Sequence, residues 1–187
     1  MAWKMILIMV FGMAMPLTAT GDQTCYLSDA EHGELTFSGV AEGNLVRGDF
    51  QDFNVEVCLE GEDLGGARIK VEVETGSASV GIRQGDEALL SEEMFFVDHY
   101  PKATWTSQSI ESHNDAYRAE GKLELRGVRA PQAVDLRLER DGDTLTLAGK
   151  AEIFRMEFEV GQGEFADTEF VEDRVELEFE LQLVPAS

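Results

Sequence analysis

The sequence VELEFELQL, residues 175–183, carries the clearest structural signal in the chain. Its residues alternate strictly in character, with Val175, Leu177, Phe179, Leu181 and Leu183 between Glu176, Glu178, Glu180 and Gln182. Successive side chains of a β-strand point to opposite faces of a sheet. The pattern therefore predicts a strand with one apolar face and one face in water.

The same alternation recurs upstream, which extends the prediction from one strand to a whole sheet. It is present at residues 34–38, 53–57, 68–74, 122–126 and 134–139. Gly and Asp clusters separate these runs, and Asp141-Gly142 is typical of a hairpin turn. Because most strands follow one another with no helix between them, the sheet should be antiparallel and all-β. One continuous apolar face indicates a sheet that curls around its own interior.

One segment departs from the strand period. In DEALLSEEMFF, residues 86–96, Leu89, Leu90 and Met94 fall at helical offsets and Asp86 suits the N-cap position. We expect one short helix there, lying over or plugging the sheet. Tyr100-Pro101 then restarts an extended strand, because the residue before a proline is pushed towards β geometry.

The N-terminus predicts export from the cytoplasm. Lys4 is followed by an uncharged, mostly apolar run from Met5 to Leu17 and then by small residues up to Gly21. This order is typical of a cleaved signal peptide, and about 13 apolar residues are too few to span a bilayer, which needs about 20. We expect residues 1–21 to be removed and residues 22–187 to form one domain.

The two cysteines, Cys25 and Cys58, both follow the predicted signal peptide. In an oxidising compartment such a pair favours a disulfide over two buried thiols. Their spacing matches no metal motif, and no metal site is predicted.

The charge balance excludes one large class of partner. The chain has 15 basic and 37 acidic residues, a formal net charge of −22. A surface this negative repels nucleic acid and anionic headgroups, and its simplest role is solubility.

No catalytic motif is present. The three histidines, His32, His99 and His113, are scattered in polar contexts, and the sequence contains no HExxH, GxSxG or phosphate-binding glycine loop. We predict no catalytic residue. The many aromatic residues are compatible either with a filled core or with a closed barrel of about eight strands that holds a ligand. Periodicity alone leaves both alternatives open.

A family resemblance bears on that choice. The stretch EALLSEEMFFVDHYPKATWTSQSI, residues 87–110, resembles the signature region of the YceI-like family of bacterial periplasmic polyisoprenoid-binding proteins. The positions that match that region are Asp86, Leu89, Met94, Phe95, Tyr100, Pro101, Ala103, Trp105 and Ser107, although Trp105 stands where phenylalanine is usual. Gly121, Leu123, Gly127 and Val128 resemble a second family motif.

The resemblance implies a lipocalin-like, extended antiparallel β-barrel in the periplasm. It also implies a non-catalytic protein that carries or stores a long lipid, such as an isoprenoid chain, an isoprenoid quinone or a fatty-acid derivative, with no obligatory cofactor. The mature chain would not insert stably into a membrane, and a homodimer is possible.

On this interpretation the lipid tail lies along the barrel lumen, and the head group stays near the helix. The expected lumen residues are Phe37, Phe53, Val71, Phe95, Trp105, Leu123 and Phe154, and the expected mouth residues are Asp86, Leu89, Met94 and Tyr100.

Two rival functions remain. An enzyme acting on a lipid-like molecule would need a polar cluster at the mouth, for which Asp86, His99 and Tyr100 are the candidates. A structural or stress-related interaction protein would have a filled core.

Overall fold

The computed structural model describes residues 23–114, 116–142 and 144–186. The predicted signal peptide, residues 1–21, lies outside the described residues. The strands are β1 (Gln23–Asp29), β2 (Gly33–Ala41), β3 (Asn44–Phe50), β4 (Phe53–Glu60), β5 (Arg68–Glu74), β6 (Ala78–Ser79), β7 (Lys102–His113), β8 (Ala116–Leu125), β9 (Val128–Asp141), β10 (Thr144–Phe154) and β11 (Arg174–Pro185). The helices are α1 (Arg83–Leu90) and the short 3-10 helices η1 (Thr75–Ser77), η2 (Arg155–Phe158) and η3 (Gly163–Ala166).

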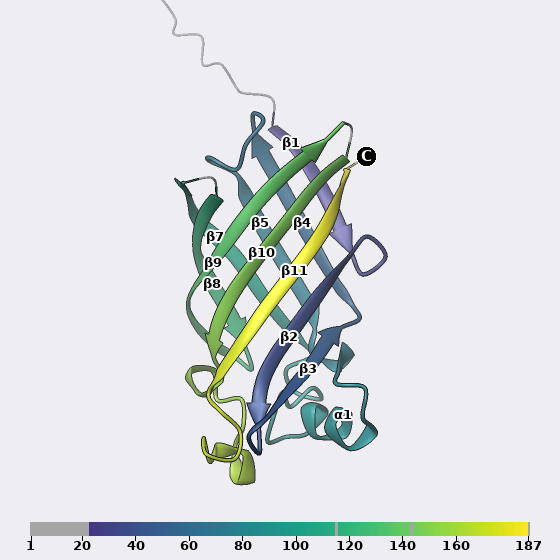
Figure 1. Cartoon of the computed structure of the whole chain (residues 1–187), viewed down its shortest axis with the longest axis vertical. Helices are drawn as coiled ribbons and strands as arrows, with labels where there is room; N and C mark the ends of the chain where they lie inside the picture. The colour runs from purple at the N-terminus through teal and green to yellow at the C-terminus, as the bar shows by residue number, and fades with distance from the viewer. Residues whose placement is uncertain (1–22, 115, 143, 187) are drawn as a thin grey trace, which may run out of the picture.

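Eight strands pair in a ring and form an elongated, closed antiparallel barrel (Figure 1). Their order is β1-β4-β5-β7-β8-β9-β10-β11, and β1 closes the ring by pairing with β11 through Tyr26 opposite Pro185 and Leu27 opposite Val184. The predicted all-β barrel of about eight strands is therefore confirmed.

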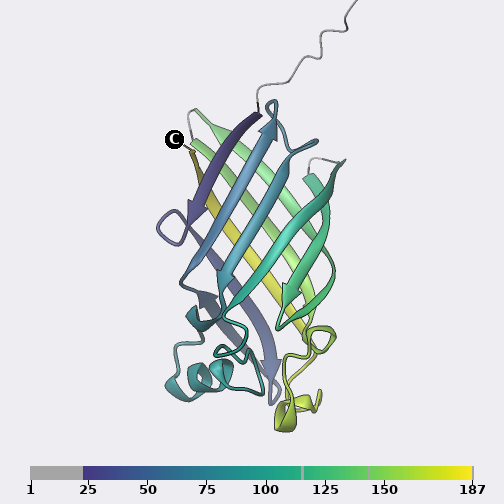
Figure 2. The same cartoon turned by 180° about the vertical axis from the view of Figure 1, so that it is seen from behind.

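The remaining strands extend the wall at one end of the barrel. β2 pairs with the first half of β11, from Glu176 opposite Ser38 to Leu181 opposite Gly33. β1 pairs with the end of the same strand, so β1 and β2 lie one after the other along one edge of β11. β3 and β6 continue from β2, and α1 lies beside them (Figures 1 and 2). We call this the helix end. The opposite end, where β1 starts and β11 finishes, is the disulfide end.

The disulfide end takes its name from Cys25 and Cys58, which the structure joins in a disulfide. The two residues face each other in the β1–β4 register. The backbone N–H of Ala186 donates to the carbonyl of Cys25, so the last residues of β11 are held at the same place.

The interior is packed differently at the two ends. At the disulfide end Leu59, Leu64, Leu145 and Leu183 are 1%, 0%, 2% and 6% exposed, and Leu64 belongs to the loop between β4 and β5. Towards the helix end the inward residues of β11, such as Leu177, are only half-buried. The alternation predicted for residues 175–183 is thus confirmed, but the inner face is not uniformly solid.

The predicted helix exists, with different bounds. It begins at Arg83 and ends at Leu90, where 86–96 was expected. Asp86 is not the N-cap, because Ile82 holds that position and Asp86 lies in the first turn. Its carboxylate accepts hydrogen bonds from the backbone N–H of Val80 (2.7 Å) and the hydroxyl of Ser79 (3.2 Å), which precede the helix. After Leu90 the chain turns back on itself.

Several outward carboxylates form ion pairs with lysine and arginine side chains on neighbouring strands. Lys102 Nζ lies 2.6 Å from Glu72, and Lys150 Nζ lies 2.5 Å from Glu178. These cations hold the pKa of Glu72 and of Glu178 below the ordinary value, chiefly through the hydrogen bond that each lysine donates. Among the described residues no helix has the length and apolar character needed to cross a bilayer.

Candidate functional site

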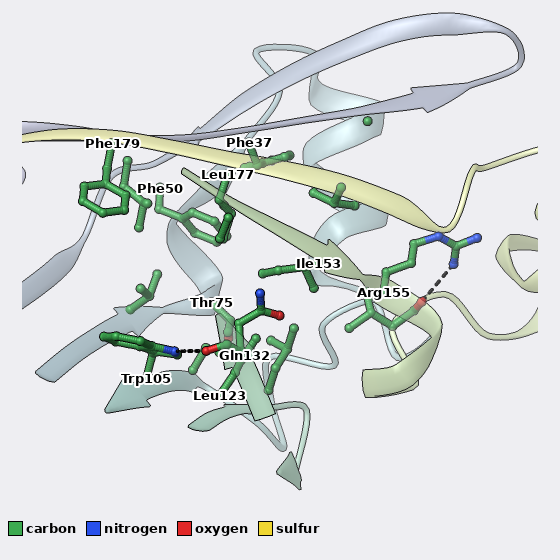
Figure 3. A pocket seen from close by; sticks show the side chains of 18 of the residues that line it. Phe37, Phe50, Thr75, Trp105, Leu123, Gln132, Ile153, Arg155, Leu177 and Phe179 are labelled. Atoms are coloured by element: carbon green, nitrogen blue, oxygen red, sulfur yellow. Dashed lines mark hydrogen bonds between the residues drawn. The ribbon is translucent and has the colours of Figure 1, made fainter. Parts of the chain in front are cut away.

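The barrel encloses a cavity of about 380 Å³ on the helix-end side of its interior. This volume lies within the range of about 300–1,000 Å³ that small-molecule sites occupy. Aliphatic and aromatic side chains dominate its lining, which draws on the inward positions of nearly every strand (Figure 3). The polar lining residues are Thr75, Thr104, Gln132, Arg155 and Glu172.

The cavity is long. On the β10 side its lining runs from Leu147 through Ala151 and Ile153 to Arg155, just past the strand. These eight residue steps, at about 3.3 Å each, cover about 26 Å of strand. A strand tilt of about 40° reduces that length to about 20 Å along the barrel axis.

The cavity is blind at the disulfide end. Leu59, Leu64, Leu145 and Leu183, which fill that end, are absent from its lining. At the helix end the lining continues onto Leu89 of α1, Phe165 of η3 and the exposed Glu172. The cavity therefore reaches the surface between α1 and the loop that carries η3.

Two chain segments meet over this mouth. The helix segment, residues 83–100, follows β6, and the loop segment, residues 155–173, joins β10 to β11. The backbone N–H groups of Gly161 and Gln162 both donate to the carbonyl of Glu93, at 2.9 and 2.7 Å. These bonds tie the two segments together directly.

Arg126, at the turn between β8 and β9, adds a second tie. Its Nη2 donates to the carbonyl of Glu92 at 2.7 Å, and its Nη1 lies 3.7 Å from the carboxylate of Glu159. The side chain of Arg126 thus touches the helix segment and the loop segment at once.

Arg155 organises the loop segment from inside. Only 3% exposed, it donates to the carbonyls of Val160 (2.9 Å), Val171 (2.6 Å) and Glu172 (3.0 Å). Burial lowers the pKa of Arg155 below its ordinary value, partly offset by the nearby Asp173. The guanidinium is therefore held by backbone dipoles and shapes the rim of the mouth.

In the wall opposite β11 the side chain of Trp105 is linked to the backbone of Gln132. The indole N–H of Trp105 on β7 donates to the backbone carbonyl of Gln132 on β9 at 3.0 Å (Figure 3). The Trp105 ring crosses the intervening strand over Gly121, where a Cβ would lie 2.5 Å from the indole. Glycine at this position is what lets the ring lie flat on the wall.

The structure brings most of the predicted residues together. The cavity wall contains Phe37, Phe53, Val71, Phe95, Trp105 and Leu123, together with Leu89 and Met94 at the mouth. Phe154 is the exception, since it is 41% exposed and does not line the cavity. The inward residues of β10 are Leu147, Ala151 and Ile153, so Phe154 has the opposite parity and points outward.

Asp86 and Tyr100 lie near the mouth but do not line the cavity. Asp86 is bonded to Ser79 and Val80, and the Tyr100 ring packs against Gly127. His99 stacks on Phe96 with ring centroids 5.2 Å apart. The three residues considered for an enzyme are therefore not placed on the cavity wall.

Sequence reasoning missed Gln132 and Arg155. Their positions in the alternating pattern predict inward-facing side chains, because Gln132 is in phase with Val134 and Leu136, and Arg155 is in phase with Ile153. Both are polar residues on an otherwise apolar inner face.

Comparison with known proteins places the chain in a family. The model of the YceI-like domain matches residues 26–183. A UPF0312 protein of Pectobacterium atrosepticum is 30% identical over 96 residues, which are 51% of this chain and 50% of that protein. The chain thus spans about half the length of the curated relatives it matches.

Solved structures share the fold. BcnA of Burkholderia cenocepacia superposes with a TM-score of 0.79 at 24% identity, covering 83% of this chain and 98% of that one. A polyisoprenoid binding domain from Saccharophagus degradans, implicated in plant cell wall breakdown, superposes with a TM-score of 0.66 at 14% identity, covering 87% and 98%. At these identities the likeness is one of fold.

Proposed function

The chain belongs to the family of the YceI-like domain, and on that premise we propose that it is a non-catalytic binding protein that holds a long lipid in its barrel. The observation that carries the proposal is the blind apolar cavity of about 380 Å³. Its length and its mouth at the helix end suit a molecule with one long apolar tail. The tail tip would point to the disulfide end and the head group would remain between α1 and the loop segment.

The energetics of such a site are favourable. Burial of apolar surface contributes about 25 cal/mol per Å², so a tail burying roughly 400 Å² gains about 10 kcal/mol before other terms. Ordering a flexible chain offsets a large part of this gain. No ion pair with the tail is required, in keeping with the aliphatic and aromatic lining.

The nature of the tail is inferred from a neighbour. The Saccharophagus degradans protein with this fold is described as a polyisoprenoid binding domain, which supports an isoprenoid chain as the tail. The proposal extends to the same tail on an isoprenoid quinone and to a fatty-acid derivative, because the aliphatic and aromatic lining suits any long apolar chain.

The proposed place of action is the periplasm. Residues 1–21 have the pattern of a signal peptide, and a lipid crossing an aqueous compartment needs an apolar enclosure. Carriage or storage of the lipid is the role that joins these two features.

The test begins with the protein purified from a periplasmic extract. Native mass spectrometry should show a bound mass that gentle organic extraction removes and that fragments as a lipid. With residues 1–21 removed, Trp105 is the sole tryptophan, so its fluorescence should respond when the extracted protein is titrated with isoprenoid alcohols of increasing length. An empty protein from every host, together with unchanged fluorescence at all lengths, would contradict the proposal.

A further inference from the structure

The side-chain amide of Gln132 is the feature of the cavity that hydrophobic binding leaves unexplained. Its two N–H groups donate to the carbonyls of Ala133 and Glu152, both at 2.9 Å. A primary amide has two donor hydrogens, and both are therefore engaged with backbone. This pairing also fixes which side of the amide is nitrogen, since only nitrogen can donate to two carbonyls.

The carbonyl oxygen of Gln132 is consequently the free side of the amide. Within the described residues it accepts no hydrogen bond from the protein. Val134, Leu123 and Ile153 line the wall around it. The oxygen is not among the fully buried unpartnered side-chain atoms, so it is accessible and can accept a hydrogen bond from a ligand.

Three other polar groups of the wall already have backbone partners. The Trp105 N–H is engaged with the backbone of Gln132, and the Thr75 hydroxyl donates to the carbonyl of Tyr100 at 2.7 Å. Arg155 directs Nε, Nη1 and Nη2 to carbonyls of the loop segment. The wall therefore offers an incoming lipid an acceptor at Gln132.

Gln132 lies inside the mouth, at the depth where the head group of a lipid joins its tail. β9 starts at the helix end with Val128, and Gln132 lies four residues further along, about 13 Å of strand from that rim. The indole of Trp105 lies beside it, across Gly121. A group held here has the whole blind part of the cavity ahead of it for the tail.

We propose that the side-chain carbonyl of Gln132 is a polar subsite that accepts a hydrogen bond from a hydroxyl group of the lipid. The inference rests on the proposed function and narrows it: the cavity selects a lipid with a hydroxyl donor at or near its head over an equally long lipid without one. A methyl ether, which has the same tail and an oxygen but no donor, is the discriminating competitor.

The test compares geranylgeraniol with its methyl ether by Trp105 fluorescence. The unaltered protein should bind the alcohol about two- to ten-fold more tightly, the range that one net hydrogen bond supports. Gln132→Met, similar in shape but without the amide, should bind both probes equally. Gln182→Met is the matched control, because it makes the same substitution at an exposed, outward position of β11 that does not line the cavity, and it should keep the preference.

A second measurement needs no variant and so does not depend on whether Gln132→Met folds. In the unaltered protein the carbon-13 resonance of the Gln132 side-chain carbonyl should shift with the alcohol and stay in place with the ether. Equal affinity for both probes, or a carbon-13 resonance that does not shift with the alcohol, would contradict the proposed subsite without contradicting lipid binding. If neither probe binds the unaltered protein, the proposed function itself fails.

Discussion

The indole of Trp105 and the backbone carbonyl of Gln132 are joined by a 3.0 Å hydrogen bond along the inner face of the barrel wall, although their strands β7 and β9 are separated by β8. The bond is possible because Gly121 of β8 has no side chain to lift the indole from the wall. One large ring thereby covers three strands and presents its apolar face to the cavity.

Replacing Trp105 with phenylalanine tests the worth of that bond. Trp105→Phe keeps an aromatic ring but leaves the backbone carbonyl of Gln132 without its indole donor in an apolar wall. An unsatisfied buried group of this kind costs about 1–3 kcal/mol, so the free energy of unfolding should fall by about that amount in urea denaturation. A loss below 0.5 kcal/mol (roughly the smallest net value for one hydrogen bond) would mean that the bond contributes little.

Reduction of the Cys25–Cys58 disulfide should lower stability without emptying the cavity. The cross-link closes a loop with a sequence separation of 33, and in the chain-entropy model such a loop stabilises the fold by about 2–4 kcal/mol. The double substitution Cys25→Ser with Cys58→Ser should lower the midpoint of thermal unfolding accordingly. Because the disulfide lies at the blind end, the affinity for lipid measured well below the new midpoint should stay unchanged.

The barrel was predictable because burial on one face leaves a period-two signal in every strand. Val175 to Leu183 show it most clearly, and the structure keeps their alternation. The helix was recognised from Leu89 and Leu90, but its start was misplaced. Asp86 has the chemistry of an N-cap, yet its carboxylate is engaged by Val80 and Ser79, a contact that depends on the tertiary position of β6.

The hollow part of the interior was not predictable from periodicity. Leu145 and Ile153 follow the same pattern on β10, but the first packs against the solid end while the second lines the cavity. At the solid end the core includes Leu64, a fully buried residue of the loop between β4 and β5, and the period of the β10 residues carries no signal of such a loop residue. Phe154 points outward because Ala151 and Ile153 occupy the inward positions of β10, and its aromatic character alone does not predict its side of the sheet.

The paired surface carboxylates predict a loss of stability in acid. Lys102 and Lys150 depress the pKa of Glu72 and Glu178, so these pairs stabilise the fold above the unfolded-state pKa, about 4.3. The contribution disappears as the pH falls through the lower folded-state values. The double variant Lys102→Met with Lys150→Met should therefore melt below the unaltered protein at pH 7 and together with it near pH 2.

The matched control for that comparison is Lys122→Met, an outward lysine of β8 for which the described residues provide no ion pair. Its melting temperature should differ from that of the unaltered protein by a similar small amount at both pH values. High salt should shrink the effect of the double variant at pH 7, because the pairs are exposed to solvent. An effect of the double variant that persists at pH 2 would assign it to lost packing of the lysine stems.

Arg126 should control how fast the lipid leaves. Its bond to the Glu92 carbonyl and its contact with Glu159 hold the helix segment and the loop segment together over the mouth. A charged hydrogen bond contributes about 1.5 kcal/mol or more, so Arg126→Met should speed release about ten-fold. Stopped-flow displacement followed through Trp105 measures this rate. Arg129→Met, which removes only the outer-face pair with Glu124, should release lipid at the unaltered rate.

Ala151 offers a way to shorten the cavity without disturbing its mouth. Its side chain is half-buried and lines the cavity between Leu147 and Ile153, so a phenylalanine there can grow into empty volume without displacing packed atoms. Ala151→Phe should fold with nearly unchanged stability and should lose affinity for tails long enough to pass this level, while shorter tails keep theirs. A chain-length series of isoprenoid alcohols measures the cutoff. Ala148→Phe, the same change at an outward position of the same strand, should leave the cutoff where it is, and an unchanged cutoff in both variants would place the lipid tail elsewhere.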